Sequence, residues 1–276
     1  MSERVEIEIL SPHGFCAGVT AALRKALALA APGRRVWCLH ELVHNELVVR
    51  DLETRGFVFV ESVDEVPPGE TVLFSAHGVS PAVRAAAAAR SLRIVDATCP
   101  FVARVHAAAR DFAARGLQVV VIGNPDHAEV RGIVGEAPSA VIIRTADDLA
   151  ALGLPRGARI GVVSQTTMNA DEVRTLVTAL GERYAVETTA EVCKATKERQ
   201  DAVRAFDGDA LLVLGSVNSS NTRRLVEVAG CRALRAGTME DVRALDLTGV
   251  RRLGVTSGAS TPESFFSEAV RHLRGR

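Results

Sequence analysis

Three of the five cysteines occupy positions from which a thiolate could bind a metal or a ligand. Cys16, Cys99 and Cys193 each follow a segment that we expect to be extended and precede one that we expect to be helical, and they lie 83 and 94 positions apart. Such turns lie at the carboxyl ends of strands, where open α/β sheets bind their ligands, and a helix N-terminus favours the thiolate. The pattern predicts three topologically similar units that each deliver one thiolate.

The other two cysteines have a different context. Cys38 lies in the apolar stretch VWCL and Cys231 in AGCRAL, which we interpret as a loop, so both are expected to be structural. Because the count of five is odd and no secretory signal is recognisable, we expect no disulfide framework.

Polar motifs recur where the expected strands end. A core rarely holds runs such as Ser-Ser-Asn or Thr-Thr, because each buried polar group without a partner costs about 1–3 kcal/mol. Loops with so many donors predict a ligand site. The motifs are HGFCAGV (13–19), HELVHN (40–45), SAHGVS (75–80), DATCP (96–100), DHAEV (126–130), SQTT (164–167), VCKAT (192–196), GSVNSSNT (215–222) and TSGAS (256–260).

Short apolar segments alternate with helical patterns along the chain, which predicts α/β architecture with mainly parallel sheets. The expected strands are 5–10, 71–75, 93–96, 118–123, 140–144, 159–164, 210–215 and 252–257. The expected helices are 19–31, 81–90, 101–115, 170–180 and 194–206.

Composition excludes several classes of protein. Lys+Arg and Asp+Glu both total 33 among 276 residues, so the net charge is zero and the basic excess of a nucleic-acid binder is missing. The N-terminal MSERVEIEIL alternates charged and apolar residues, unlike a signal peptide. No run approaches the roughly 20 apolar residues that a membrane span needs. We therefore expect a cytoplasmic protein without nucleic-acid or membrane partners.

Taken in order, the nine motifs resemble those of the LytB/IspH family of 4-hydroxy-3-methylbut-2-enyl diphosphate reductases, from about Gly14 to Pro262. The resemblance implies a trefoil of three similar α/β domains around a central cluster-binding cavity, with one cysteine from each domain. We place the domains at 14–97, 98–191, and 192–276 together with 1–13.

The resemblance also implies a [4Fe–4S] cluster, whose ligands match Cys16, Cys99 and Cys193. Thiolates suit iron–sulfur clusters, and three ligands instead of four leave one iron open as a Lewis acid. Loss of that iron would leave a [3Fe–4S] species. Zinc is the competing metal, although its sites usually contain closely paired ligands such as CxxC, which this sequence lacks; a site without metal is the other alternative.

The family's substrate and proton-transfer residues match further positions. Glu129 would be the catalytic acid, with Thr166 and His127 beside it. We expect residues 127–129 to be extended, so that the side chains of His127 and Glu129 face the same way. His13, His40, His106 and His272 are expected to be structural or surface residues. Substrate binding would involve His44, His77, His127, Thr166, Thr167, Ser219, Ser220, Asn221 and Ser260.

The implied reaction is a two-electron reductive dehydroxylation of an allylic diphosphate that gives isopentenyl and dimethylallyl diphosphate, the last step of the methylerythritol phosphate pathway. Since no GxGxxG or flavin motif is present, the electrons would come from a ferredoxin or flavodoxin.

Several positions depart from the family's pattern and leave alternatives open. Asp126 stands where the family generally has Gly, and Ala128 where it has Pro; Thr20, His13 and Ile133 also differ from the usual residues. A paralogue that reduces another allylic diphosphate remains one alternative. A non-catalytic iron–sulfur sensor and a cluster-free phosphoester hydrolase are the others.

Overall fold

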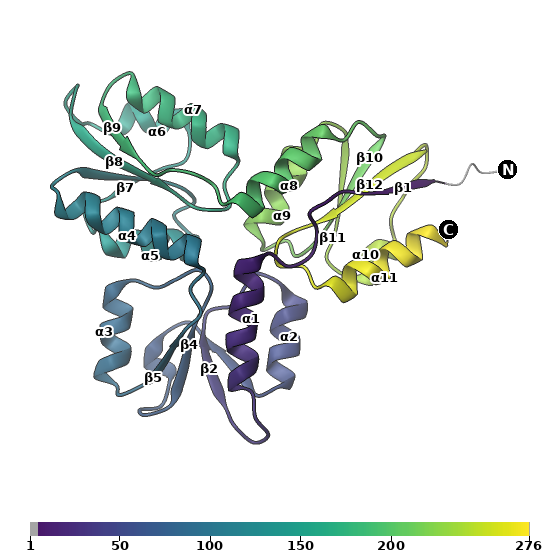
Figure 1. Cartoon of the computed structure of the whole chain (residues 1–276), viewed down its shortest axis with the longest axis horizontal. Coiled ribbons are helices and arrows are strands. Elements are labelled where there is room, and N and C mark those ends of the chain that lie inside the picture. The colour runs from purple at the N-terminus through teal and green to yellow at the C-terminus, as the bar shows by residue number, and fades with distance from the viewer. Residues whose placement is uncertain (1–4, 276) are drawn as a thin grey trace. The chain divides into compact units, whose positions relative to one another are not determined.

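The computed structural model describes residues 5–275, and strands alternate with helices throughout this range (Figure 1). Its strands form three four-stranded sheets in which every pairing is parallel. The predicted α/β class with parallel sheets is therefore confirmed. No helix among the described residues is long and apolar enough to cross a membrane.

The strands are grouped by sheet as follows. The first sheet has the order β3 (Phe57–Val60), β2 (Val36–Leu39), β4 (Thr71–Phe74) and β5 (Arg93–Asp96). The second has the order β7 (Val141–Ile143), β6 (Gln118–Ile122), β8 (Arg159–Ser164) and β9 (Ala185–Thr188). The third has the order β1 (Glu6–Ile9), β12 (Arg252–Ser257), β10 (Ala210–Leu214) and β11 (Arg232–Ala236).

The three sheets share one strand order once the third is read from β10. We number the strands of each sheet from β2, β6 and β10, with β1 as the fourth strand of the third sheet. In each sheet the second strand then lies on one side of the first strand, and the third and fourth strands lie on its other side. In the third sheet the fourth place, beside β12, is taken by the N-terminal strand β1 and not by a strand that follows β12 in the chain (Figure 1). This explains why a cysteine follows β5, β9 and β1: each of these is the fourth, outer strand of its sheet.

The helices are α1 (Ala17–Leu29), α2 (Glu46–Thr54), α3 (Pro81–Ala89), α4 (Pro100–Ala114), α5 (Ala128–Glu136), α6 (Ala146–Ala151), α7 (Ala170–Gly181), α8 (Lys194–Ala205), α9 (Ser220–Glu227), α10 (Met239–Arg243) and α11 (Glu263–Arg274), with a 3₁₀ turn at Val63–Glu65. Local signals set several starts: the Ser80 hydroxyl caps α3, and Pro81 follows at its first position, where no N–H is needed.

Apolar residues cover both faces of the sheets. Val120 and Ile122 of β6 belong to one core cluster, whereas Val119 and Val121 belong to the cluster on the opposite face. Strands buried on both faces are typical of parallel sheets, and they explain why these segments are apolar throughout instead of alternating.

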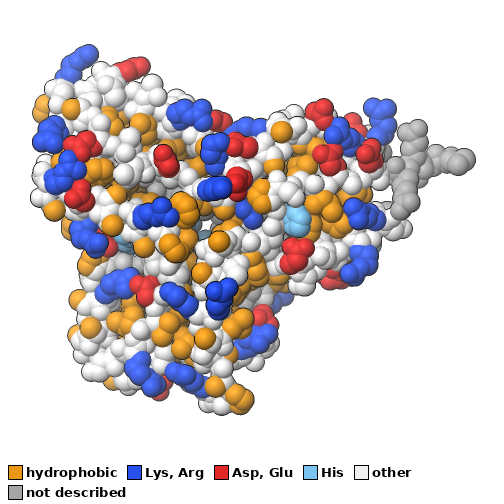
Figure 2. All heavy atoms as spheres, in the orientation of Figure 1, with side chains coloured by type: hydrophobic (Ala, Val, Ile, Leu, Met, Phe, Trp, Pro, Cys, Tyr) orange, Lys and Arg blue, Asp and Glu red, His pale blue; other side chains and the backbone are white. Residues whose placement is uncertain are grey.

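The chain divides into two compact units. The first contains the described residues up to Thr20, His44–Arg50 and the chain from Lys194 on, and thus the third sheet; the second contains Ala21–Val43 and Asp51–Cys193, with the other two sheets. The strands of each sheet fall within one of the three predicted domain ranges, whose boundaries stay a prediction. On the face that Figure 2 shows, basic and acidic side chains are interspersed.

All predicted strands and helices are present, with ends that differ by one or two residues. The AGCRAL stretch was only half correctly interpreted: residues 229–231, with Cys231, lie in a loop as expected, but Arg232–Ala236 forms strand β11. The segment was misread because β11 is an outer strand with two arginines in five residues, so it lacks the apolar run of the inner strands.

Candidate active site

The predicted site residues gather at one kind of position in the fold. In each sheet the chain order reverses between the first and third strands, and the loops after those two strands bound the crevice where doubly wound sheets bind ligands. His127 follows β6 and Thr166 follows β8 in the second sheet, and His77 follows β4 in the first. Asn221 and Ser260 follow β10 and β12 in the third.

Glu129 is the most unusual of these groups, because its carboxyl group is buried and is hydrogen-bonded by Thr166. Its side chain is 1% exposed. The backbone N–H of Thr166 donates to Oε1 at 2.7 Å, and the Thr166 hydroxyl is 3.2 Å from Oε2. Burial raises the pKa of Glu129 to about 7, although both hydrogen bonds from Thr166 oppose that shift. A carboxyl group that holds a proton near neutral pH is suited to act as an acid.

The segment around Glu129 differs from the predicted extended conformation. His127 is the N-cap of α5, and Glu129 lies in the first turn of that helix. The expectation of an extended segment, on which the same-side arrangement of the two side chains depended, was therefore wrong. It failed because a β6–turn–α5 unit places the motif at the helix start, where an N-cap followed by an acidic first turn is favourable.

The N-cap geometry of His127 fixes the proton on its ring. Nδ1 of His127 accepts a hydrogen bond from the backbone N–H of Glu129 at 3.2 Å. An accepting Nδ1 carries no proton, so the neutral ring is protonated at Nε2. The ring stands edge-on to that of His77, with centroids 5.5 Å apart. The second unit thus brings two of the three predicted diphosphate-binding histidines together.

The backbone of one residue, Thr166, links the acid to a predicted cluster ligand. The N–H of Thr166 donates to Glu129, and the C=O of Thr166 accepts from the backbone N–H of Cys193 at 3.0 Å. The neighbouring Gln165 joins the loops after β6 and β8, since its amide bonds both Asn124 N–H at 3.1 Å and the Thr167 hydroxyl at 2.9 Å. Thr167 is therefore held by Gln165 in this arrangement.

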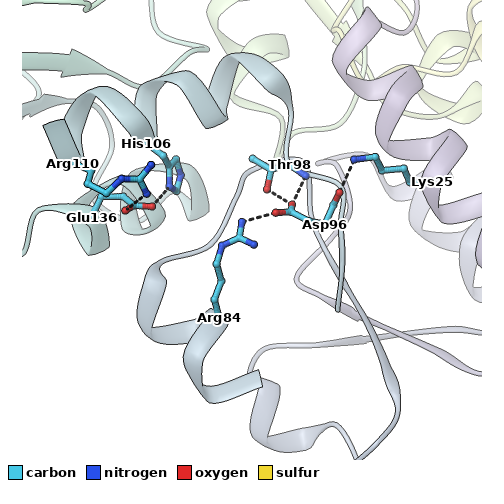
Figure 3. Close-up of polar contacts among 7 residues, drawn as sticks. All are labelled: Lys25, Arg84, Asp96, Thr98, His106, Arg110 and Glu136. Atoms are coloured by element: carbon cyan, nitrogen blue, oxygen red, sulfur yellow. Dashed lines mark hydrogen bonds and ion pairs between the residues drawn. The ribbon is translucent and has the colours of Figure 1, made fainter. Parts of the chain in front are cut away.

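Cys99 is held in the same way by its backbone. It is the N-cap of α4, and its N–H donates to Ala76 C=O at 3.0 Å, next to His77. The preceding turn is closed by the Asp96 carboxylate, which accepts from the Thr98 N–H at 2.8 Å and from the Thr98 hydroxyl at 2.5 Å (Figure 3). Arg84 of α3 donates to the other Asp96 oxygen at 2.5 Å. Although burial acts the other way, these bonds lower the pKa of Asp96 and keep it ionised.

Cys16 lies in the first unit, immediately before α1. Its N–H donates to Ala259 C=O at 3.0 Å, and the N–H of Val19 points at its sulfur at 3.4 Å. Gly14, with a φ of +68°, donates to the Ser257 hydroxyl at 2.7 Å. The loop of Cys16 is thereby attached to the loop after β12, which contains Ser260.

The polar residues after β10 and β12 form a connected network in the first unit. Asn221 accepts from the Ala259 N–H at 2.9 Å and approaches the Thr196 hydroxyl at 3.3 Å, while Ser219 caps α9. The Ser260 hydroxyl donates to His44 C=O at 3.1 Å. Ser220 is the first residue of α9 and is buried. These residues form one cluster, in which the side chains of Asn221 and Ser260 hydrogen-bond to the backbone of neighbouring loops.

One contributor to this cluster was missed from the sequence. Arg199 of α8 is 2% exposed and donates to Gly14 C=O at 2.8 Å, so a buried cation supports the loop of Cys16. No local signal identifies it, because its partner lies 185 positions away.

Cys38, His13 and His40 have structural surroundings, as expected. Cys38 is completely buried, and burial raises the pKa of its thiol well above the ordinary value. His13 stacks on Phe266 with centroids 3.9 Å apart, and His40 lies 2.9 Å from Glu61. Cys16, Cys99 and Cys193 form no disulfide and, unlike Cys38, are half-buried.

Comparison with known proteins places this arrangement in a family. A family model described as "LytB protein" matches residues 7–274. The chain belongs to the LytB family. The expected family resemblance is thus confirmed over nearly the whole sequence.

Relatives of the LytB family share the full extent of the chain. A protein of Mycobacterium bovis named 4-hydroxy-3-methylbut-2-enyl diphosphate reductase 2 is 44% identical, over 99% of this chain and 88% of its own length. A 4-hydroxy-3-methylbut-2-enyl diphosphate reductase of Ralstonia nicotianae is 43% identical, over 98% of this chain and 86% of its own.

Two solved structures of similar sequence have the same fold. The E-1-hydroxy-2-methyl-but-2-enyl-4-diphosphate reductase from Plasmodium falciparum superposes with a TM-score of 0.92 at 31% identity, over 98% of this chain and 88% of that one. A second structure, described as (E)-4-hydroxy-3-methyl-but-2-enyl diphosphate reductase, the terminal enzyme of the non-mevalonate pathway, gives 0.69 at 30% identity over 99% and 100% of the two chains.

Proposed function

We propose that this chain reduces 4-hydroxy-3-methylbut-2-enyl diphosphate to isopentenyl and dimethylallyl diphosphate. The reaction consumes two electrons and two protons: the allylic C–O bond breaks, a C–H bond forms and water leaves. The observation that carries the proposal is the buried Glu129 carboxyl, joined through Thr166 to the backbone of Cys193. The names of the LytB relatives and of the solved structures support the substrate.

The donor set fits the [4Fe–4S] cluster that the family resemblance implies. Cys16, Cys99 and Cys193 form no disulfide, each immediately precedes a helix, and each backbone N–H is already bonded to a loop carbonyl. We propose that these three thiolates hold the cluster. Soft sulfur ligands suit iron–sulfur centres, whereas zinc sites usually contain closely paired N/S ligands, which these three cysteines do not provide. When bound, the cluster would supply the electrons and an iron site of Lewis-acid character for the substrate hydroxyl.

Glu129 and Thr166 would deliver the proton that the leaving oxygen needs. The backbone N–H of Thr166 occupies Oε1 of Glu129, so the carboxyl proton is placed on Oε2, which faces the Thr166 hydroxyl. Glu129 then donates to Thr166 Oγ1 while Thr166 passes its own proton to the substrate oxygen. Without this proton the C–O bond would have to release hydroxide.

The diphosphate would be bound by side chains and helix starts around the loops. His77 and His127 lie edge to edge, and the Nε2–H of a neutral His127 is a donor that matches a phosphate oxygen. We assign the same role to His44, Thr167, Ser219, Ser220, Asn221 and Ser260. The N-terminus of α9, which carries Ser220 and Asn221, adds the partial positive charge that favours an anion.

Anaerobic turnover tests the proposal directly. Reconstituted protein with a reduced mediator, and then with ferredoxin or flavodoxin as the proposed electron donor, should convert the substrate to the two products. An iron–sulfur sensor would show cluster absorption but no reductant-dependent turnover. A phosphoester hydrolase would release phosphate without iron or reductant, and a paralogue would prefer another allylic diphosphate. Any of these three results would contradict the proposed reaction.

The protonation of Glu129 gives a second test. Because burial raises its pKa to about 7, the carboxyl is protonated below that pH, and kcat should fall as the pH rises through about 7. Infrared difference spectra should show a protonated-carboxyl band that disappears over the same range and is missing in Glu129→Gln. Thr166→Val keeps the backbone donor but removes a hydroxyl that lowers this pKa, so its midpoint should move upward. A band that titrates near pH 4.5, the ordinary value for Glu, would contradict this assignment.

A further inference from the structure

A second buried polar cluster lies beside the residues assigned to diphosphate binding and proton transfer. His106 of α4 is 6% exposed, and its Nδ1 lies 3.0 Å from Oε1 of Glu136, the last residue of α5 (Figure 3). Arg110 donates to the other Glu136 oxygen at 3.1 Å. The cluster connects α4, which starts after Cys99, to α5, which His127 caps and whose first turn contains Glu129.

The other edge of the His106 ring makes no hydrogen bond among the described residues. Its Nε2 is buried without a partner. Burial lowers the pKa of His106, with Arg84 and Arg110 acting in the same direction and Glu136 opposing them, so the ring is neutral. A neutral ring that donates from Nδ1–H to Glu136 has a bare Nε2. This edge of the ring therefore contacts its neighbours through van der Waals packing and not through hydrogen bonds.

Two glycines provide the space that this edge occupies. A Cβ on Gly78 would lie 2.8 Å from Nε2 of His106, and a Cβ on Gly132 would lie 2.9 Å from its Cε1. Real Cβ atoms essentially never come this close to another atom. Gly78 directly follows His77, and Gly132 lies one turn after Glu129 on α5. The ring thus fills a slot between the His77 loop and the helix of His127 and Glu129.

We propose that His106 is a positioning residue whose ring sets the spacing between His77 and the His127–Glu129 end of α5, and thereby the affinity for the diphosphate. The inference rests on the proposed function, because it assigns the two histidines to that ligand. The ring centroids of His77 and His127 are only 5.5 Å apart, so a small shift of the His77 loop against α5 changes how both rings can reach one diphosphate. Misplacement by about 1 Å can cost about 100-fold in rate.

His106→Asn separates positioning from stability. Asn Nδ2 can replace the Nδ1–H donor toward Glu136, but the residue lacks the Cε1–Nε2 edge that fills the slot. We expect the Kd for inorganic diphosphate to rise about tenfold or more and kcat/KM to fall by about 10–100-fold, with Tm near that of the unchanged protein. Rates are taken per cluster, so that iron content does not enter the comparison.

Gly132→Ala tests the same slot from its other wall. The added methyl must push His106 or the helix away, although Ala is a better helix former than Gly. We expect weaker diphosphate binding without a loss of Tm, and partial rescue in the double variant with His106→Asn, where the slot has room. Gly181→Ala is the matched control: Gly181 ends α7 of the same unit, and a Cβ there meets nothing within 4 Å.

The outcomes separate the two proposals. If the unchanged protein turns over the substrate while His106→Asn and Gly132→Ala bind diphosphate as it does, or lose only Tm, His106 is structural and the inference is wrong. If the unchanged protein neither binds diphosphate nor turns over, the proposed function fails, and the inference fails with it. Weak binding in both single variants, recovery in the double variant and an unaffected Gly181→Ala would establish the spacing role.

Discussion

Replacing Glu129 by Gln is expected to lower kcat by about 10²–10⁴-fold, the usual contribution of a positioned general acid. Gln has nearly the same shape and can still accept the N–H of Thr166 at the position of Oε1. The amide cannot donate an acid proton through Thr166, so the leaving oxygen would depart without one. The measurement is single-turnover and steady-state kinetics under anaerobic conditions, with the visible spectrum and KM expected to stay close to those of the unchanged protein.

Asp126→Asn is the matched control for this substitution. Asp126 lies three residues before Glu129 but is exposed, and it stands where the LytB/IspH pattern generally has Gly. Its replacement removes a negative charge from the same loop without changing the buried carboxyl, so kcat should stay within about twofold, as for most surface substitutions. Retention of most activity by Glu129→Gln, or an equal loss in Asp126→Asn, would remove Glu129 from the role of acid.

The positions of the cysteines were predictable because they depend on a local rule. A strand, a short turn and a helix can be recognised within about 20 residues, and Cys16, Cys99 and Cys193 each stand at such a turn. The parallel class follows from inner strands that are apolar on both faces. The motif after each switch-point strand was also visible in the sequence, because runs of Ser, Thr, Asn and His follow these apolar segments.

The start of α5 shows where sequence reasoning reached its limit. DHAEV contains an apolar–polar alternation that suits a strand end, yet Glu129 lies in the first turn of helix α5, which runs from Ala128 to Glu136. Two glycines, Gly132 and Gly135, lie inside this helix and weaken its local signal. Packing favours them, since a Cβ would meet His106 at the first and Ser80 at the second, 2.2 Å away. A tertiary requirement thus overrides local propensity.

The residues that support the site from behind, such as Arg199 and the His106–Glu136 pair, could not be predicted for a different reason. Arg199 and its partner Gly14 are 185 positions apart, and His106 and Glu136 are 30 apart on different helices. These side chains are identified only when the sheets bring their elements together. Their residue types are those of ordinary exposed helix positions, so neither composition nor spacing distinguishes them from a solvated face.

Removal of any one of the three proposed cluster ligands should have the largest effect of all. Cys193→Ala leaves two of the three proposed thiolate ligands. The amounts of iron and sulfide bound per chain should therefore fall, together with the broad visible absorption of the cluster. Turnover should fall by more than about 100-fold, because even changes in the groups behind a metal ligand cost up to about that much. Cys99→Ala and Cys16→Ala should behave in the same way.

Cys193→Ala also separates loss of the cluster from loss of the fold. Its backbone N–H bond to Thr166 C=O does not involve sulfur, so Thr166 should still hold Glu129, and the protonated-carboxyl band of Glu129 should persist in the iron-free variant. Cys231→Ala is the control, since Cys231 is also half-buried but precedes β11 instead of a helix. Its iron content and turnover should not change. Full iron and activity in Cys193→Ala would show that the three thiolates do not act on one centre, and the proposed reductase chemistry would then lose its cofactor.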